Sequence, residues 1–289
     1  VELPANITKI APSGTVATMI LAAFALTGCS STDYKSLDGI KKAGKLVVYT
    51  EAGFPPYEFV SDNEIVGVDI QIMKAVAEKI GVTLEVKDVA FNTICASVKT
   101  GKAAVGAAGI TIDDERKASV DFSEPYSSTE QYVIVAIDND SIKTVEDLNG
   151  KQIGVQEGTT SDFLISDLIS KGTLANSALK SFLAPAIAAA QIGKIDAVIA
   201  DKLTAGIIVA NNSDKYKTFK LTDKNGGDVG ETEQYGIAVA KGNTELLAVI
   251  NEVIDELLKD GSIEKWVTEY SELAKKIEES TASTGESTN

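Results

Sequence analysis

The feature that most constrains the fold of this chain is an alternation of two hydrophobic patterns, which begins at Lys45. Short apolar runs rich in β-branched residues predict strands, and the amphipathic stretches between them predict helices. The predicted strands span residues 46–50, 83–86, 104–108, 132–137, 152–155, 195–200 and 235–240. The clearest predicted helices span residues 69–80 and 244–260, and another begins near Thr144. Alternating strands and helices predict an α/β fold with mainly parallel sheets.

Two segments of the chain resemble each other. Residues 101–109 (GKAAVGAAG) and 193–201 (GKIDAVIAD) each begin with Gly-Lys and continue into a buried strand of small residues. Chance similarity between Ala-rich strands is one explanation, and two α/β lobes of like design is the other. Open α/β sheets bind ligands at the carboxyl ends of their strands. The second explanation therefore predicts that Gly109 and Asp201, the last residues of the two segments, face a shared cleft.

Composition disfavours several classes of function. A length of 289 residues is enough for one large or two medium domains with proper cores. The net charge of −15 argues against nucleic acid as a partner, because phosphate-binding surfaces concentrate Lys and Arg. The chain has no His and only two cysteines, Cys29 and Cys95, which provide neither a disulfide framework nor metal-site spacing. We expect no metal, no cofactor and no catalytic residue.

The first thirty residues have the pattern of an export signal. The apolar run at residues 16–26 is shorter than the ~20 residues that span a bilayer but suits the core of a signal peptide. It leads into residues 26–29 (LTGC), which resemble a bacterial lipobox whose Cys is acylated. The alternative is a buried helix with an incidental Cys. We expect a signal peptide at residues 1–28, a lipid anchor at Cys29, a tether at residues 29–35, and an extracytoplasmic, membrane-tethered protein.

Six motifs follow one another along the rest of the chain. They are residues 54–59 (FPPYEF), 67–70 (GVDI), 108–117 (AGITIDDERK), 120–126 (VDFSEPY), 154–160 (GVQEGTT) and 235–239 (YGIAV). In this order, over residues 37–272, they resemble the polar-amino-acid family (family 3) of bacterial extracytoplasmic solute-binding proteins, the receptors of ABC importers. The resemblance implies a two-lobed α/β fold of the periplasmic-binding-protein type (type II), with a central ligand cleft and two crossing hinge strands near residues 128–132 and 232–236.

The resemblance also implies the domain organisation. Lobe 1 comprises residues 36–129 and 235–276, and lobe 2 comprises residues 130–234. The polar, low-complexity tail at residues 277–289 is expected to be disordered. A receptor of this family closes on a free amino acid and delivers it to the membrane permease of the importer. We expect it to do so as a monomer.

Arg116 is the residue that we expect to bind the ligand carboxylate. Of the 27 basic residues, only Arg116 is an arginine, whose planar fork grips a carboxylate through two parallel hydrogen bonds. The alternative is a surface arginine in a Lys-rich sequence. By resemblance, Arg116 binds the α-carboxylate with help from Thr111 and from backbone N–H groups near Thr111 and Thr160. Asp113 is in position to cap the short helix that carries Arg116.

Asp201 is the expected partner of the ligand ammonium. By resemblance, it accepts the α-ammonium, and Gly109 lets the ligand approach and offers its backbone carbonyl. The alternative for Asp201 is an ordinary N-cap of a helix that begins at Lys202. Because Arg116 and Asp201 would lie on different lobes, a bound zwitterion would bridge the lobes and favour closure.

Three further residues are expected around the ligand side chain. By resemblance, Phe54 and Phe91 sandwich it, although both would also be unremarkable core residues. Glu51 lies where related receptors carry an acid, which suits a cationic side chain such as that of arginine, lysine or ornithine but can also accept from an amide. Gln156 stands where a glutamine-selective receptor would be expected to have Lys, which disfavours glutamine.

Several alternatives stay open at this point. Glutamine and cystine are alternative ligands for the same receptor role. A chemosensory ligand-binding domain is a rival of another class, and it normally continues into membrane-spanning and signalling segments. A dehydratase on the same scaffold is a second rival, and it would need Glu51 or Asp201 as its general acid or base because the chain has no His.

Overall fold

A computed structural model describes the backbone of residues 33–284 and the side chains of residues 33–276. The predicted signal peptide, Cys29 and the first part of the predicted tether lie outside the described residues. Within the described part, no helix is both long enough and apolar enough to cross a membrane.

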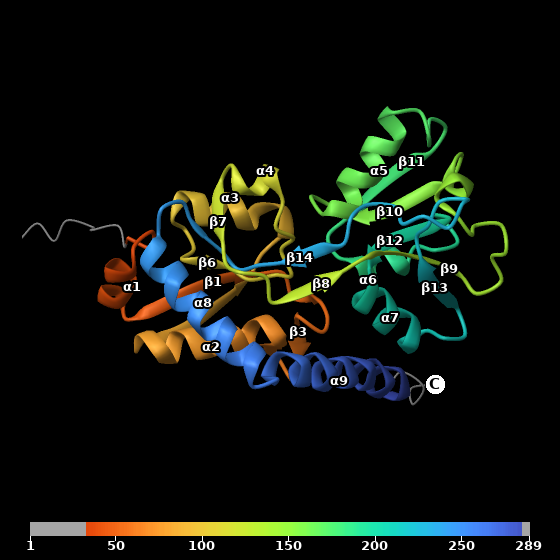
Figure 1. Cartoon of the computed structure of the whole chain (residues 1–289). Coiled ribbons are helices and arrows are strands. Elements are labelled where there is room, and N and C mark those ends of the chain that lie inside the picture. The colour runs from red at the N-terminus through yellow and green to blue at the C-terminus, as the bar shows by residue number, and fades with distance from the viewer. Residues whose placement is uncertain (1–32, 285–289) are drawn as a thin grey trace, which may run out of the picture. The chain divides into compact units, whose positions relative to one another are not determined.

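Two open sheets organise the fold (Figure 1). The first has the order β5-β1-β6-β15-β7, with β1 (Lys45–Thr50), β5 (Thr83–Asp88), β6 (Val105–Gly106), β7 (Val120–Phe122) and β15 (Ala238–Ala240). The second has the order β11-β10-β12-β9-β13, with β9 (Gln131–Ala136), β10 (Gln152–Gln156), β11 (Ala178–Phe182), β12 (Ala197–Asp201) and β13 (Tyr216–Lys220). We use lobe 1 for residues 36–129 and 235–276, around the first sheet, and lobe 2 for residues 130–234, around the second.

The two sheets have the same internal plan. The repeated segments supply the central strands, β6 and β12, and each is parallel to the strand on one side and antiparallel to the strand on the other. The expectation of mainly parallel sheets holds for strand direction, because four of the five strands in each sheet run the same way, while β15 and β9 run against them. The antiparallel members next to the centre, β15 and β9, follow directly on the segments that cross between the lobes, so they enter their sheets in the opposite direction.

Those crossing segments form a small sheet of their own. Strands β8 (Ser127–Thr129) and β14 (Glu233–Tyr235) pair antiparallel, at the places where two hinge strands were predicted. The predicted strand at 235–240 is split near Gly236, because the residues before it pair with β8 and those after it pair with β6 and β7. A second small antiparallel sheet in lobe 1 contains β2 (Gly53–Phe54), β3 (Glu58–Ser61) and β4 (Glu64–Val66).

Helices cover the sheets. Lobe 1 carries α1 (Leu37–Ala43), α2 (Val68–Ile80), the 3-10 turn η1 (Phe91–Thr93), α3 (Ile94–Thr100), α4 (Asp114–Lys117), α8 (Thr244–Lys259) and the start of α9 (Ser262–Thr284). Lobe 2 carries η2 (Val145–Leu148), α5 (Thr160–Ser170), α6 (Pro185–Ala189) and α7 (Lys202–Asn211). The helix predicted near Thr144 is only the turn η2, whose capping box joins Thr144 and Asp147.

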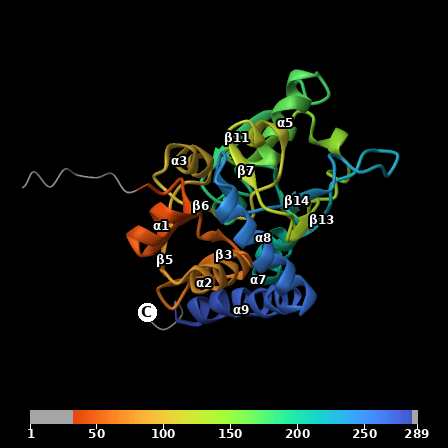
Figure 2. The same ribbon diagram turned by 60° about the vertical axis from the view of Figure 1, so that its left-hand side comes forward.

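Helix α9 extends further than expected. Its backbone stays helical to Thr284, through part of the tail that we expected to be disordered from residue 277. The sequence at 272–279 is rich in Glu, Lys and Ala, which favour helix, and the first helix-terminating residue is Gly285. The helix lies against α7 of lobe 2 in both ribbon views (Figure 1, Figure 2), where the Asn211 side chain donates to the Ala274 carbonyl.

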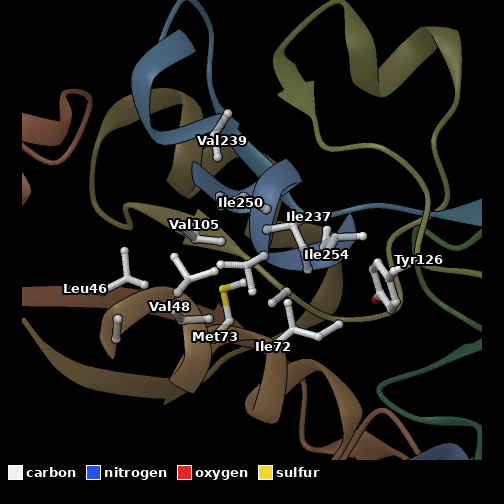
Figure 3. Close-up of a cluster of buried hydrophobic side chains, with 14 of the residues drawn as sticks. Leu46, Val48, Ile72, Met73, Val105, Tyr126, Ile237, Val239, Ile250 and Ile254 are labelled. Carbon is white, nitrogen blue, oxygen red and sulfur yellow. The ribbon is translucent and has the colours of Figure 1, made fainter. Parts of the chain in front are cut away.

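The main core of lobe 1 lies between its sheet and the helices α2 and α8 (Figure 3). Its members include Leu46, Val48, Ile72, Met73, Val105, Ile237, Val239, Ile250 and Ile254, each at most 1% exposed. Full burial of such a side chain contributes about 1.5–3 kcal/mol. Lobe 2 has a separate core of the same kind, which includes Val133, Val135, Leu148, Ile153, Val155, Ile165 and Ile199. Two independent cores leave the carboxyl ends of β6 and β12 to meet between the lobes.

Candidate functional site

A small cavity between the lobes brings together most of the predicted ligand residues. It is lined by Phe54, Phe91, Ala108, Gly109, Thr111, Arg116, Gln156, Thr159, Thr160 and Asp201. Its volume of about 20 Å³ is room for about one water molecule. An amino acid is several times larger, so its entry requires the lobes or the lining side chains to move apart. Glu51 does not line the cavity but contacts Gln156, which does.

Arg116 is held in place by both lobes. Asp113 caps α4 by accepting from the Arg116 backbone N–H at 2.7 Å, as predicted from the sequence. The guanidinium donates to the Thr111 carbonyl at 2.9 Å and to the lobe 2 carbonyl of Gly158 at 3.1 Å. It also lies over the Phe91 ring, 5.4 Å from the ring centre, which is a cation–π arrangement. Arg116 is therefore a buried, fixed cation at the cavity wall, and not a surface residue.

The hydroxyls of Thr111 and Thr160 meet at one carboxylate oxygen. Thr111 from lobe 1 donates to Glu233 Oε2 at 2.6 Å, and Thr160 from lobe 2 donates to the same atom at 2.7 Å. The other oxygen of Glu233 accepts from Gln131 Nε2 at 2.6 Å. Glu233 lies in β14, between the lobes. The two threonines thus lie at the cavity as expected, but their hydroxyls are bonded to this hinge carboxylate.

Asp201 points into the same region from the carboxyl end of β12. It precedes α7, yet its side chain makes no capping hydrogen bond to that helix, so the N-cap alternative does not explain it. Its carboxylate accepts from Tyr235 Oη at 2.6 Å. Burial raises the pKa of Asp201 to about 7, and the charge of Glu233 adds to this, while the Tyr235 hydroxyl and Arg116 oppose it. A cation placed beside Asp201 would lower the pKa of this carboxyl group and so oppose the effects of burial and of the Glu233 charge.

Glu51 and Gln156 form a contact across the cleft at its other end. Gln156 Nε2 donates to Glu51 Oε2 at 2.8 Å and to the Leu183 carbonyl at 2.7 Å. Burial raises the pKa of Glu51 to about 7, and the charge of Asp88 also raises it, while the bond from Gln156 lowers it. A half-buried acid with a second acid nearby favours a positive charge as its partner.

The aromatic residues and Gly109 complete the walls. The Phe54 ring packs on Tyr57 with ring centres 5.7 Å apart and lies edge-on to Tyr235. Gly109 has φ +52°, and a Cβ there would lie 2.6 Å from Phe54 Cε1, so this position requires glycine. Phe54 and Phe91 both line the cavity.

Sequence reasoning missed three functional residues that the structure adds to this group. Glu233 and Tyr235 lie two residues apart on β14, so their side chains point to the same face, and both reach the cleft. That spacing, together with the motif beginning at Tyr235, is a signal from which Glu233 could have been found. Gln131 bonds to Glu233, Ser161 and Thr160, and no motif marked it.

The cleft is acidic as a whole. Glu51, Asp201 and Glu233 approach it from three different elements, whereas Arg116 is the cation among the residues that line the cavity. In the part of the chain that the structure describes, no group of three or more potential ligands lies close enough together to hold a metal ion. The cavity wall itself therefore offers one cation, Arg116, and one carboxylate, Asp201.

Comparison with known proteins assigns the family. The sequence matches the bacterial extracellular solute-binding proteins, family 3, over residues 46–272. It is 31% identical to the L-cystine-binding protein TcyJ of Escherichia coli, with 89% of this chain and 97% of that protein covered. It is 30% identical to the arginine-binding extracellular protein ArtP of Bacillus subtilis, with 84% and 91% covered.

The fold matches in the same way. The amino acid ABC transporter substrate-binding protein AbpA of Streptococcus pneumoniae, solved with L-arginine bound, superimposes with a TM-score of 0.75 at 32% identity, over 82% of this chain and 98% of that one. These relatives are two-lobed amino-acid-binding proteins, and they match along nearly their whole length. The chain therefore belongs to the bacterial extracellular solute-binding proteins, family 3.

Proposed function

We propose that this protein is the receptor of an ABC importer for a cationic amino acid, namely arginine, lysine or ornithine. The observation that carries the proposal is the placement of Arg116 on lobe 1 and Asp201 on lobe 2, at the wall of one cavity. An amino acid carries a carboxylate and an ammonium on the same carbon, and these two side chains offer one charged partner to each. A ligand held from both lobes binds the closed arrangement better than the open one, which couples binding to closure.

The side-chain preference rests on the far end of the cleft. Glu51 is half-buried near the charge of Asp88, and its present partner is the neutral amide of Gln156. A guanidinium or ammonium in place of that amide adds a charge-assisted hydrogen bond, which is about twice as strong as a neutral one. Glutamine and cystine remain the alternatives, because Glu51 and Gln156 can also bond to an amide or an α-amino group, and one relative is named for cystine.

A thermal-shift screen tests the receptor role. The panel is the twenty common amino acids with ornithine, citrulline and cystine, because a ligand that binds only the folded protein raises its melting temperature by mass action. We expect the largest shifts for arginine, lysine and ornithine, and a smaller one for citrulline, which has the shape of arginine without its charge. A larger shift with glutamine or cystine would replace the cationic assignment, and no shift with any compound would refute the receptor role.

We further propose that Cys29 carries a lipid that tethers the protein at the outer side of the cytoplasmic membrane, where the permease docks. The supporting feature is the apolar run followed by Leu26-Thr27-Gly28-Cys29. Several acyl chains on one Cys give stable anchoring, whereas a single chain does not. Radioactive palmitate should label the protein in bacterial cells and should not label the Cys29→Ser variant. Equal labelling of the two would refute the anchor.

A further inference from the structure

A pair of carboxyl groups lies buried behind the cavity wall in lobe 1. Glu58 belongs to β3, Asp69 belongs to the first turn of α2, and both are 0% exposed. No Lys or Arg forms an ion pair with either of them among the described residues. Buried acids without a cationic partner reduce stability, because the charged form loses its hydration. Their presence therefore calls for a role other than holding the core together.

The local fold forces the two acids together. The first turn of α2 is tied to the segment that precedes Glu58: Val68 N–H donates to the Pro56 carbonyl at 3.1 Å, and Asp69 N–H donates to the Tyr57 carbonyl at 3.0 Å. Gly67 permits this approach, because it has φ +137° and a Cβ there would lie 2.1 Å from the Tyr57 carbonyl oxygen. The motifs FPPYEF and GVDI thus meet at this point, and the ligand-binding role described above does not use either acid.

Asp69 reaches the ligand cavity through Gly109. Its Oδ2 accepts a hydrogen bond from the Gly109 backbone N–H at 2.9 Å, and this bond is buried. Gly109 lines the cavity, and its backbone has the left-handed φ of +52°. The Gly109 carbonyl accepts none of the hydrogen bonds found among the described residues, which leaves it available to a ligand ammonium. The N–H and the carbonyl of Gly109 lie in neighbouring peptide planes joined by φ and ψ, so a bond that holds the N–H fixes one of the two planes from which the carbonyl is directed.

The two acids differ in the hydrogen bonds that their surroundings give them. Its Oδ1, both carboxyl oxygens of Glu58 and the Tyr126 hydroxyl are buried without a hydrogen-bond partner among the described residues. Burial, followed by the charge of Asp69, raises the pKa of Glu58 well above its usual range. Burial raises the pKa of Asp69 to about 6, and the Gly109 N–H opposes that shift. The Gly109 N–H thus favours the charged form of Asp69, whereas no hydrogen bond among the described residues supports a charge on Glu58.

We propose that Asp69 is a positioning residue that holds the Gly109 backbone N–H, so that the carbonyl of the same residue faces the ammonium of the ligand. A charged acceptor holds the Gly109 N–H about twice as strongly as a neutral one. The inference rests on the proposed function, since it needs a ligand with an ammonium group. The proposal gives a role to the motifs FPPYEF and GVDI, from which only Phe54 lines the cavity.

The test compares two ligands that differ only in the ammonium. L-arginine and 5-guanidinopentanoic acid share the guanidinium and the carboxylate, but the second lacks the α-ammonium. We expect Asp69→Asn to weaken the binding of L-arginine roughly tenfold and that of the analogue less than about threefold, since only the ammonium uses the Gly109 carbonyl. A similar loss for both ligands would indicate a general structural role and would overturn the proposal, as would no loss for either.

A conservative variant and a direct readout complete the design. Glu58→Gln keeps the size of the side chain beside Asp69 and should bind L-arginine within about threefold of wild type, whereas a loss as large as that of Asp69→Asn would show that the effect is not specific to the contact between Asp69 and Gly109. If Asp69→Asn does not fold, the amide resonance of Gly109 in the wild-type protein decides. It should lie downfield, as for an N–H bonded to a carboxylate, and a random-coil position unchanged between pH 4.5 and 7.5 would refute the contact.

The outcomes separate this inference from the receptor role. If wild type binds no amino acid in the screen, the receptor role fails, and the inference fails with it. If wild type binds L-arginine and the two ligands respond alike to Asp69→Asn, only the inference fails.

Discussion

Acidification should weaken the binding of arginine more steeply than the binding of citrulline. In the proposed complex, the α-ammonium of either ligand requires a charged Asp201, and only the guanidinium of arginine requires a charged Glu51. Burial raises the pKa of each of these two carboxyl groups to about 7. A bound cation stabilises the charged form, so the complex binds fewer protons than the free protein. Affinity is therefore complete well above pH 7 and is lost as the pH falls through 7.

The expected magnitude follows from the fraction of each group that is charged. A carboxyl group with a pKa of about 7 is about 90% charged at pH 8 and about 10% charged at pH 6, so a complex that needs its charge weakens roughly tenfold over this range. Citrulline depends on one such group, Asp201, and should weaken roughly tenfold. Arginine depends on both, and should weaken roughly a hundredfold, or about 2.7 kcal/mol.

Isothermal titration calorimetry at pH 6, 7 and 8 measures both ligands. The ratio of the two affinities isolates Glu51, because the titration of the shared ammonium, of Asp201 and of Asp69 cancels in it. Glu51→Gln should make the two pH profiles parallel, while Glu245→Gln, the same change at an exposed position of α8, should leave the wild-type difference intact. Parallel profiles in the wild-type protein would refute the assignment of Glu51 to the cationic end of the ligand.

Three further outcomes are expected. Arg116→Lys should weaken arginine binding by about 1.5–3 kcal/mol, the worth of a hydrogen bond between charged groups, and a calorimetric affinity near that of wild type would contradict the fork argument. In a urea titration, Gly109→Ala should lower the free energy of unfolding by about 1–3 kcal/mol more than Gly81→Ala does. Both positions have a left-handed φ, but only the Cβ at position 109 would strike a neighbouring ring, that of Phe54. Equal losses for the two variants would contradict this reasoning. In the absence of ligand, the free energy of unfolding should rise as the pH falls from 8 to 5. The reason is that Asp201 and Glu51 bind protons near pH 7 in the folded protein and only near pH 4 in the unfolded chain. A steady fall of the free energy of unfolding over this range would contradict the raised pKa values.

What could be predicted from the sequence was the part of the site that is built locally. Arg116 and its cap Asp113 are three residues apart on a single turn of helix, and their bond was predicted. Asp201 was found because it ends a strand that has a counterpart in lobe 1. The role of Glu233 was not predictable in this way, because its partner Thr111 is 122 residues away and the two meet only when β14 returns beside lobe 1. Long-range meetings depend on how the chain crosses between the sheets.

The same reason explains why the one antiparallel strand of each sheet was not predicted. Hydrophobic periodicity identifies a strand but does not say which way it runs. Strands β9 and β15 enter their sheets from the hinge, and this route, rather than any property of their side chains, makes them antiparallel to β12 and β6. The positions where the chain crosses between the lobes were predicted, and the antiparallel strands follow from those crossings. The alternation of predicted strands and helices did not reveal this consequence.

The contacts across the cleft show where affinity and where selectivity arise. Thr111 and Thr160 already donate to Glu233, so a ligand carboxylate that takes these hydroxyls replaces one hydrogen bond by another and gains little from the exchange. Asp201 is different, because burial and the charge of Glu233 oppose its charged form more than the Tyr235 hydroxyl and Arg116 support it. A ligand ammonium adds to that support and displaces no internal cation. We infer that Asp201 contributes more to affinity for the shared amino-acid backbone than the threonines do. Selectivity among side chains is then left to Glu51, whose charged form is likewise opposed by burial.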